Sequence, residues 1–150
     1  MTISQPQITQ RQETTIEITG TSSVVGEIYS IIVKEIGSLD EAFIYETTQA
    51  NRSAEQLAQG IFDVINNDSN TSYEATRDGS VLTLFNTASS TVYTTKVVVQ
   101  GDASLSATTT KPVEGFYIIG GTINLNEGLV TETTSYTIDF NTIGSKCSND

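Results

Sequence analysis

The chain has 150 residues and a formal net charge of −11, from 18 Asp and Glu against 7 Lys and Arg. It contains no His and one Cys, which excludes a Ser-His-Asp triad, a Cys-His pair and a histidine metal site. The acidic balance argues against direct nucleic-acid binding, which depends on Lys and Arg neutralising phosphates, and the 24 Thr and 16 Ser favour a β-rich domain.

The N-terminal segment, residues 1–12, predicts an extended arm because it is polar, rich in Gln and Thr, and interrupted by Pro6. It lacks the basic start and apolar stretch of a signal peptide. No apolar run approaches the length of a membrane-spanning helix, about 18 residues. We therefore expect a protein that is made in the cytoplasm without Sec-type export and does not associate with membranes.

The first strands follow from alternating apolar and polar residues. Residues 14–19 predict one strand, and residues 24–36 predict a longer one. The two faces of the longer strand carry Tyr29, Ile31 and Val33 against Ile28, Ser30, Ile32 and Lys34. Because both faces contain apolar residues, we expect a central strand that is covered on both sides. A hairpin loop at 37–40 leads to a return strand at 41–47.

One helix interrupts the strands. Ser53 and Gln56 have the spacing of a capping box, and Glu55 lies in the first turn, where the helix dipole favours an acid. Apolar residues then recur at steps of three and four and form one stripe: Ala54, Leu57, Ala58, Ile61, Phe62 and Ile65. This pattern predicts a helix over about 54–66.

The second half of the chain predicts short strands. Residues 73–77 and 81–85 flank Asp78-Gly79, a strong two-residue hairpin signal. Further strands are expected at 91–100, 116–125 and 136–140.

The segments between these strands predict loops and irregularities. Residues 101–110 are Thr-rich and predict a loop, and Gly120-Gly121 predicts a bulge or bend within its strand. Residues 141–150 form a polar C-terminal tail.

Together these elements predict a mainly β (α+β) fold, a β-sandwich or barrel-like domain of about eight strands with one inserted helix. The single domain would cover residues 13–140, with an added hairpin at about 113–140. The segments 1–12 and 141–150 would be extended terminal arms.

Pairs of carboxylates are the candidates for acid–base catalysis. The pairs that the pattern places close together are Glu41 with Glu46, Asp63 with Asp68, and Glu74 with Asp78. None lies in an apolar stretch that would raise its pKa, so solvated surface charge is the simpler interpretation. We therefore predict a non-enzymatic protein without catalytic residues.

Oxygen atoms suited to calcium cluster around the end of the predicted helix, at Asp63, Asn66, Asn67, Asp68 and Asn70. Their spacing does not match a calcium-binding loop, and Asn and Asp commonly end helices. The glycines are too scattered for a phosphate-binding loop. We predict no metal and no cofactor.

The central part of the chain has a familiar order of elements. The helix from Ser53 to Asn66, with Leu57 and Ile61 at its apolar positions, is followed by Tyr73-Glu74-Ala75-Thr76 and by Asp78-Gly79-Ser80-Val81-Leu82-Thr83-Leu84. With the preceding strands and the following Thr/Val strand, this pattern over about 15–100 resembles a β-rich structural module of tailed-bacteriophage virion proteins, of the decoration, tail and sheath type.

The resemblance implies a non-enzymatic structural subunit of a tailed-phage virion, foremost a head decoration or cement-type protein that makes assembly contacts through its arms. The alternatives are a tail subunit and a fibre or adhesin module that binds glycans. The implied partners are copies of the chain itself and other virion proteins. We also expect Arg11, Lys111 and Lys146, in flexible regions, to seat on acidic neighbours.

Overall fold

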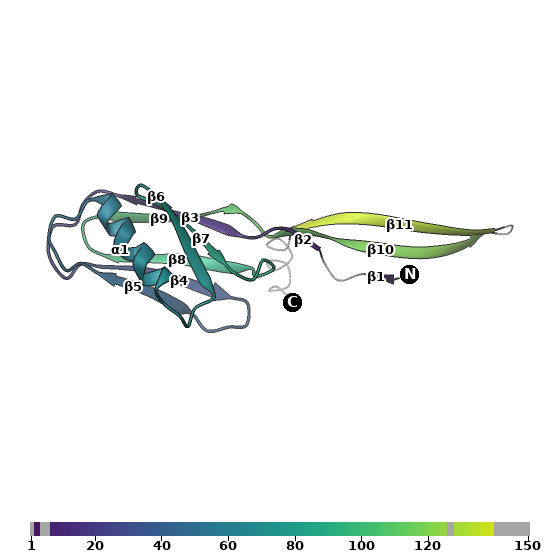
Figure 1. Ribbon diagram of the computed structural model, residues 1–150, viewed down its shortest axis with the longest axis horizontal. Coiled ribbons are helices and arrows are strands. Elements are labelled where there is room, and N and C mark those ends of the chain that lie inside the picture. Colours follow the sequence, from purple (N-terminus) through teal and green to yellow (C-terminus); the bar gives the residue numbers. More distant parts are fainter. Residues whose placement is uncertain (1, 4–6, 126–127, 140–150) are drawn as a thin grey trace.

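The protein consists of a two-sheet body from which a long two-stranded ribbon projects (Figure 1). The computed structural model describes the backbone of residues 2–3, 7–125 and 128–139, and the side chains of residues 8–115. The predicted polar tail and Lys146 therefore lie outside the described residues. No helix in the described part of the chain is long and apolar enough to cross a membrane.

The body contains two antiparallel sheets. The first sheet has four strands in the order β6 (Tyr73–Asp78), β7 (Val81–Asn86), β3 (Glu13–Thr19) and β9 (Ser104–Lys111). The second sheet has three strands in the order β5 (Glu41–Glu46), β4 (Ile28–Glu35) and β8 (Tyr93–Gln100). The strands β8 and β9 follow each other in the chain, so residues 101–103 form a corner between the sheets.

The third sheet is the ribbon with the N-terminal strands along one side. Its long strands are β10 (Glu114–Leu125) and β11 (Gly128–Asp139), which pair continuously from end to end. On the other side of β10 lie β1 (Thr2–Ile3) and β2 (Gln7–Gln10). The predicted extended arm is therefore extended, and its described parts are held against the ribbon as strands.

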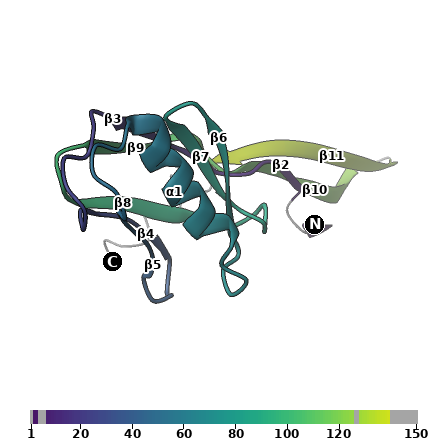
Figure 2. The same ribbon diagram turned by 60° about the vertical axis from the view of Figure 1, so that its left-hand side comes forward.

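The helix α1 (Ala54–Asn66) lies between β5 and β6 and contacts both strands (Figure 2). Ser53 accepts a hydrogen bond from the Gln56 backbone N–H, and the Gln56 side chain accepts one from the Ser53 backbone N–H, which is the predicted capping box. Gly60 brings the helix close to β5, since a Cβ there would lie 2.3 Å from the Tyr45 ring. The helix thus closes the open side of the two sheets.

A single core fills the space between the two body sheets and the helix. It contains the alternate residues Tyr29, Ile31 and Val33 of β4 and the helix residues Leu57, Ala58, Ile61 and Ile65. The Tyr73 ring meets Phe43 and Tyr93 edge-on, with centroids 6.2 and 5.1 Å away. The prediction of a mainly β fold with one helix is therefore confirmed, whereas the described residues form no closed barrel.

Three sequence predictions about strands are wrong. The strand expected from residue 24 begins only at Ile28, because Val24 to Glu27 form a turn with Gly26 at φ +88°. The predicted Gly120-Gly121 bulge is absent from the β10–β11 register. The last strand begins at Gly128 rather than at 136, because it pairs with the whole length of β10.

A fourth prediction is also wrong, because most of the loop predicted at 101–110 is strand β9. Within β9 only Leu105 is buried and Ala107 half-buried, so the strand has a weak apolar alternation. Its Thr and Ser residues occupy a sheet position because β9 pairs with β3 along nearly its whole length. Pairing with the distant strand β3, rather than local sequence preference, therefore determines the strand conformation of β9.

Candidate functional site

The predicted carboxylate pairs do not form a common site. Asp63 accepts a hydrogen bond from the Gln59 side chain at 2.8 Å on the exposed side of α1. Glu46, Glu74 and Asp78 are exposed. Among the described residues, no group of three or more His, Cys, Asp or Glu is arranged to hold a metal ion.

The Asn and Asp residues at the end of α1 serve the backbone. The Asn66 side chain bonds both backbone groups of Ala75, donating to its carbonyl at 2.8 Å and accepting from its N–H at 2.9 Å. Asp68 accepts from the Asn70 N–H at 2.9 Å. These contacts join α1 to β6, and they leave the proposed calcium ligands turned to different partners.

Glu27 is a buried carboxylate that the sequence analysis missed. One of its oxygens accepts from the backbone N–H groups of Ser23 and Val24, at 2.7 and 3.0 Å. The other accepts from the Tyr29 hydroxyl and from the Asp102 N–H. Glu27 therefore fastens the turn before β4 to the corner between β8 and β9.

The environment of Glu27 stabilises its charged form. The hydrogen bond from Tyr29 is the largest cause that lowers the pKa of Glu27 to about 2, and it outweighs the opposing effect of burial. Burial, followed by the bond to Glu27, raises the pKa of Tyr29 to about 12. A Cβ at Gly101 would lie 2.5 Å from the Glu27 carboxylate, so glycine is required there. The donors around Glu27 bond within this cluster, so the cluster holds the turn before β4 against the corner between β8 and β9.

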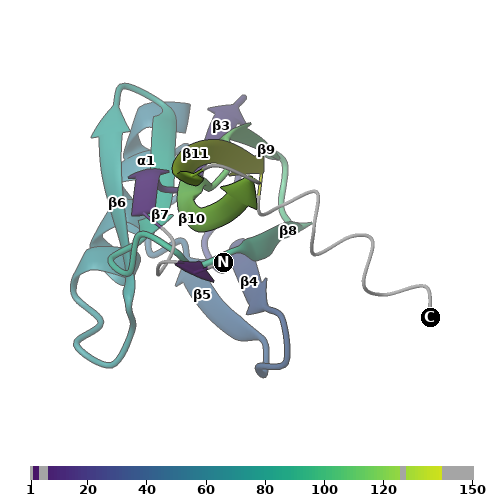
Figure 3. The same ribbon diagram turned by 90° about the vertical axis from the view of Figure 1, so that its right-hand side faces the viewer.

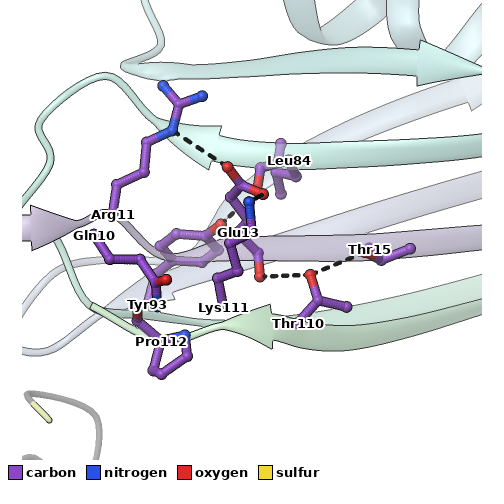
Figure 4. Close-up of polar contacts among 9 residues, drawn as sticks. All are labelled: Gln10, Arg11, Glu13, Thr15, Leu84, Tyr93, Thr110, Lys111 and Pro112. Carbon is purple, nitrogen blue, oxygen red and sulfur yellow. Dashed lines mark hydrogen bonds and ion pairs between the residues drawn. The ribbon is translucent and has the colours of Figure 1, made fainter. Parts of the chain in front are cut away.

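The neck between body and ribbon is a second polar cluster (Figure 4). The Gln12 side chain donates to the Tyr93 carbonyl at 2.7 Å and accepts from the Tyr93 N–H at 3.1 Å, so it pairs with β8 as a backbone would. The Gln10 side chain donates to the Pro112 carbonyl at 2.8 Å. The Gln12 amide therefore joins the start of β3 to β8, and the Gln10 amide joins the end of β2 to the segment between β9 and β10.

Arg11 and Lys111, which were expected to bind acidic groups of other molecules, form ion pairs within the neck. Arg11 lies 3.8 Å from the Glu13 carboxylate, and its guanidinium stacks 3.6 Å from the centre of the Phe85 ring. Lys111 lies 3.0 Å from the other Glu13 oxygen. The Glu13 carboxylate therefore contacts both Arg11 and Lys111 at the edge of the first sheet. The prediction that these two residues occupy flexible regions is wrong.

A shallow hollow of about 200 Å³ lies beside the β4–β5 turn, lined by Glu35, Leu39, Glu41 and Tyr73 among others. The Tyr73 hydroxyl donates to Glu35 at 2.9 Å, and the Asn86 side chain donates to the same oxygen at 3.2 Å. Burial raises the pKa of Tyr73 well above its usual range. The hollow is therefore the polar end of the core rather than an enclosed binding site.

The ribbon is the feature that stands apart from the rest of the molecule. Each strand has 12 residues, and no described sheet or helix of the body packs along the ribbon (Figure 1). Figure 3 shows the ribbon end-on, in front of the body. At about 3.3 Å per residue, it reaches about 40 Å from the neck. An isolated two-stranded hairpin is marginally stable in water, so an element of this length indicates a surface that receives support from elsewhere.

Comparison with known proteins adds no relative. No protein-family description, no curated protein and no solved structure matches the chain.

Proposed function

We propose that the protein is a non-enzymatic structural subunit that assembles with copies of itself through its ribbon. The observation that carries the proposal is the ribbon itself, with two 12-residue strands outside the core that stabilises the body. Burying such a ribbon against a neighbour supplies the packed layer that it lacks within one chain.

The edges of the sheets support the same proposal. In the body, α1 lies between the edge strands β5 and β6, and the edge strands β8 and β9 contact each other at the corner. In the ribbon, no described strand pairs with the outer side of β11. The β11 sequence contains no Pro and no Lys, the residues that commonly protect an exposed edge.

The particle that we propose is a tailed-phage virion, on the strength of the resemblance in residues 15–100. Within it, a head decoration or cement-type role is the first candidate, and a tail subunit is the second. A glycan-binding role gains no support from the body, because the exposed large apolar side chains within residues 8–115 include no aromatic ring. The large aromatics Tyr29 and Phe43 are buried in the core.

Two measurements test this function. Light scattering of the purified full chain should show concentration-dependent oligomers, and electron microscopy should show closed rings, tubes or shells. Mass spectrometry of purified virions should then find the chain in many copies, on heads for decoration or along tails for a tail role. A chain that stays monomeric at millimolar concentration and is absent from particles would contradict the proposal.

A further inference from the structure

The exposed apolar side chains of the body are concentrated in one segment. Large hydrophobic residues with more than half of their surface exposed are Val24, Val25, Ile36, Leu39 and Ile44, with Leu39 at 93% and Ile44 at 57%. All lie on the β4–β5 hairpin or on the turn that leads into it. Val24 and Val25 lie just before the start of β4, Ile36 and Leu39 lie at its turn end, and Ile44 lies between them on β5. Exposed apolar residues gathered on one element are candidates for an interaction surface.

The outer faces of the two body sheets differ in the polarity of their residues. Across the first sheet, the strand registers align a row of threonines, Thr76, Thr83, Thr15 and Thr108. The corresponding rows across the second sheet are more apolar: one has Ile44 and Val98 on either side of Ser30, and the next has Ala42 and Lys96 on either side of Ile32. No described element packs on this outer face. The sequence prediction of cover on both sides of β4 is therefore met on the inner side alone.

Charge distinguishes this face from the rest of an acidic chain. Lys34 and Lys96 are both exposed at one end of the face, and Lys96 makes no ion pair within the described residues. Lys34 lies 3.6 Å from Asp40. At the opposite end, Glu46 is paired in register with Ile28. The β4–β5 face is thus an apolar surface with two lysines at the end nearest the hairpin turn.

The ribbon has the complementary character. Its strands contain Glu114, Glu132 and Asp139 but no Lys or Arg. The β10–β11 register places Tyr117 opposite Tyr136 and Ile123 opposite Val130, and alternation assigns both pairs to one face of the ribbon. Glu132, the partner of Gly121, falls on the same face, whereas Glu114 and Asp139 are partners at the base of the ribbon. A ribbon face with apolar pairs and one acid therefore matches an apolar face that carries lysines.

We propose that the ribbon of one copy docks on the β4–β5 face of the next copy, an inference that rests on the assembly function proposed above. The contact is head-to-tail, because the ribbon and the face are different surfaces of the same chain. Each subunit donates its ribbon to one neighbour and receives a ribbon from another, so the contacts close into a ring or continue as a tube.

The small area of one ribbon contact indicates why a closed ring of subunits would be more stable than a single pair. A ribbon about 40 Å long and about 10 Å wide offers about 400 Å² on one face, which is half of the about 800 Å² per partner in a stable interface. Donating one ribbon and receiving another brings each subunit to that area. Assembly is therefore expected to rise steeply with concentration.

The test compares two aspartate substitutions in the full chain. Ile44→Asp places a charge in the middle of the β4–β5 face, and Thr83→Asp places one on the threonine row of the other sheet. We expect Ile44→Asp to raise the concentration for half-assembly at least about tenfold, a loss of about 1.4 kcal/mol per contact, and Thr83→Asp to change it less than about twofold. Both variants should keep a cooperative melting transition of the body.

Each outcome separates the two proposals. If the unmodified chain does not assemble, the proposed function fails, and this inference fails with it. If the unmodified chain assembles and Ile44→Asp assembles equally well, the ribbon docks elsewhere, and only this inference is overturned. Equal loss with Thr83→Asp would also overturn it, because the effect would then be one of charge alone.

Cysteine cross-linking identifies the occupant of the face. In a Cys147→Ser background, one chain carries Ile44→Cys and a second carries Ile123→Cys, on the apolar alternation of the ribbon. The mixture should form a disulfide-linked heterodimer on mild oxidation, and each chain alone should form none. A homodimer of the Ile123→Cys chain would show ribbon–ribbon pairing, and a homodimer of the Ile44→Cys chain would show face–face pairing; either overturns the inference.

Discussion

The body and the ribbon are built from similar sequence but are stabilised in opposite ways. In the body, strands such as β3 alternate between buried and more exposed residues, and side chains such as Ile31 and Leu84 are fully buried. The ribbon has the same alternation and the same wealth of Thr, but no described layer covers it. Alternation therefore predicts a strand in both regions, and only the body contains the cover that the pattern implies.

This difference separates the two tasks of the chain. Buried contacts within the body stabilise it, together with the hydrogen bonds of Glu27 and the helix cap. In the proposed assembly, the ribbon and the β4–β5 face are the parts that contact a second molecule. Substitutions in the core should therefore change stability without changing the mode of assembly, and substitutions in the ribbon or on the β4–β5 face should do the reverse.

Shortening the ribbon should have the largest effect. Since Gly115 and Ile138 are Cα partners, a tight turn can replace residues 116–137 without disturbing the neck. We expect assembly to be abolished, while the melting temperature of the body changes by only a few degrees. A shortened chain that still assembles, or a body that no longer melts cooperatively, would contradict the division into two regions.

Truncating a core residue should destabilise the body strongly. Ile31 is 0% exposed, and Ile31→Ala should lower the free energy of unfolding by about 3 kcal/mol through lost burial and the cavity left behind. Ile44→Ala on the same sheet is the matched control, because its side chain is 57% exposed, and it should cost about 0.5 kcal/mol or less. Urea unfolding of both variants, in the shortened chain, measures the difference; equal losses would argue against this placement of the core.

The buried, hydrogen-bonded Glu27 carboxylate should make the stability of the folded protein depend on pH. The pKa of Glu27 is lowered from 4.5 to about 2 in the folded protein, so its ionised form stabilises the fold above pH 4.5, and this contribution is lost as the pH falls toward 2. Glu27→Gln should therefore lower the melting temperature by several degrees at neutral pH and by progressively less between pH 4.5 and 2. A constant difference over that range would show that the charge is not the cause.

Gly101→Ala tests the cluster around Glu27 by steric means. A Cβ at this position would lie 2.5 Å from Glu27 and 2.6 Å from the Tyr29 hydroxyl, so we expect a loss of about 1–3 kcal/mol. Gly37→Ala serves as a comparison, since nothing lies within 4 Å of a Cβ there and only its φ of +78° is unfavourable. The result would be contradicted if Gly101→Ala were the milder of the two in urea unfolding.

A substitution in the neck should have the smallest effect on stability and assembly. Arg11→Ala removes the stacking on Phe85 and the partly exposed ion pair with Glu13, which together should contribute about 1 kcal/mol. We expect a slight loss of stability that shrinks at high salt, with assembly weakened modestly as the ribbon becomes less firmly directed. Lys34→Ala, at an exposed ion pair outside the neck, should leave stability almost unchanged.

Local sequence predicted those elements whose signals are local. The capping box at Ser53 and Gln56 and the apolar stripe of α1 appear where the pattern placed them. The hairpin between β6 and β7 is also present, but its two turn residues are Gly79 and Ser80 rather than Asp78 and Gly79, because Asp78 pairs with Val81. Strand β9 and the full length of β11 were missed, because their Thr and Ser residues gain strand conformation only by pairing with β3 and β10. Glu27 was missed because no local pattern shows that the corner at Asp102, 75 residues away, covers this turn and donates to its carboxylate.

Hydrogen exchange of the full chain, measured as monomer and as assembly, tests the central claim most directly. We predict that in the monomer the amides of β10 and β11 exchange much faster than those of β4 and β7, and that assembly protects the ribbon together with the edge strand β5. If the ribbon amides were already as protected in the monomer as those of the body, or stayed unprotected in the assembly, the ribbon would not be the element that joins one subunit to the next.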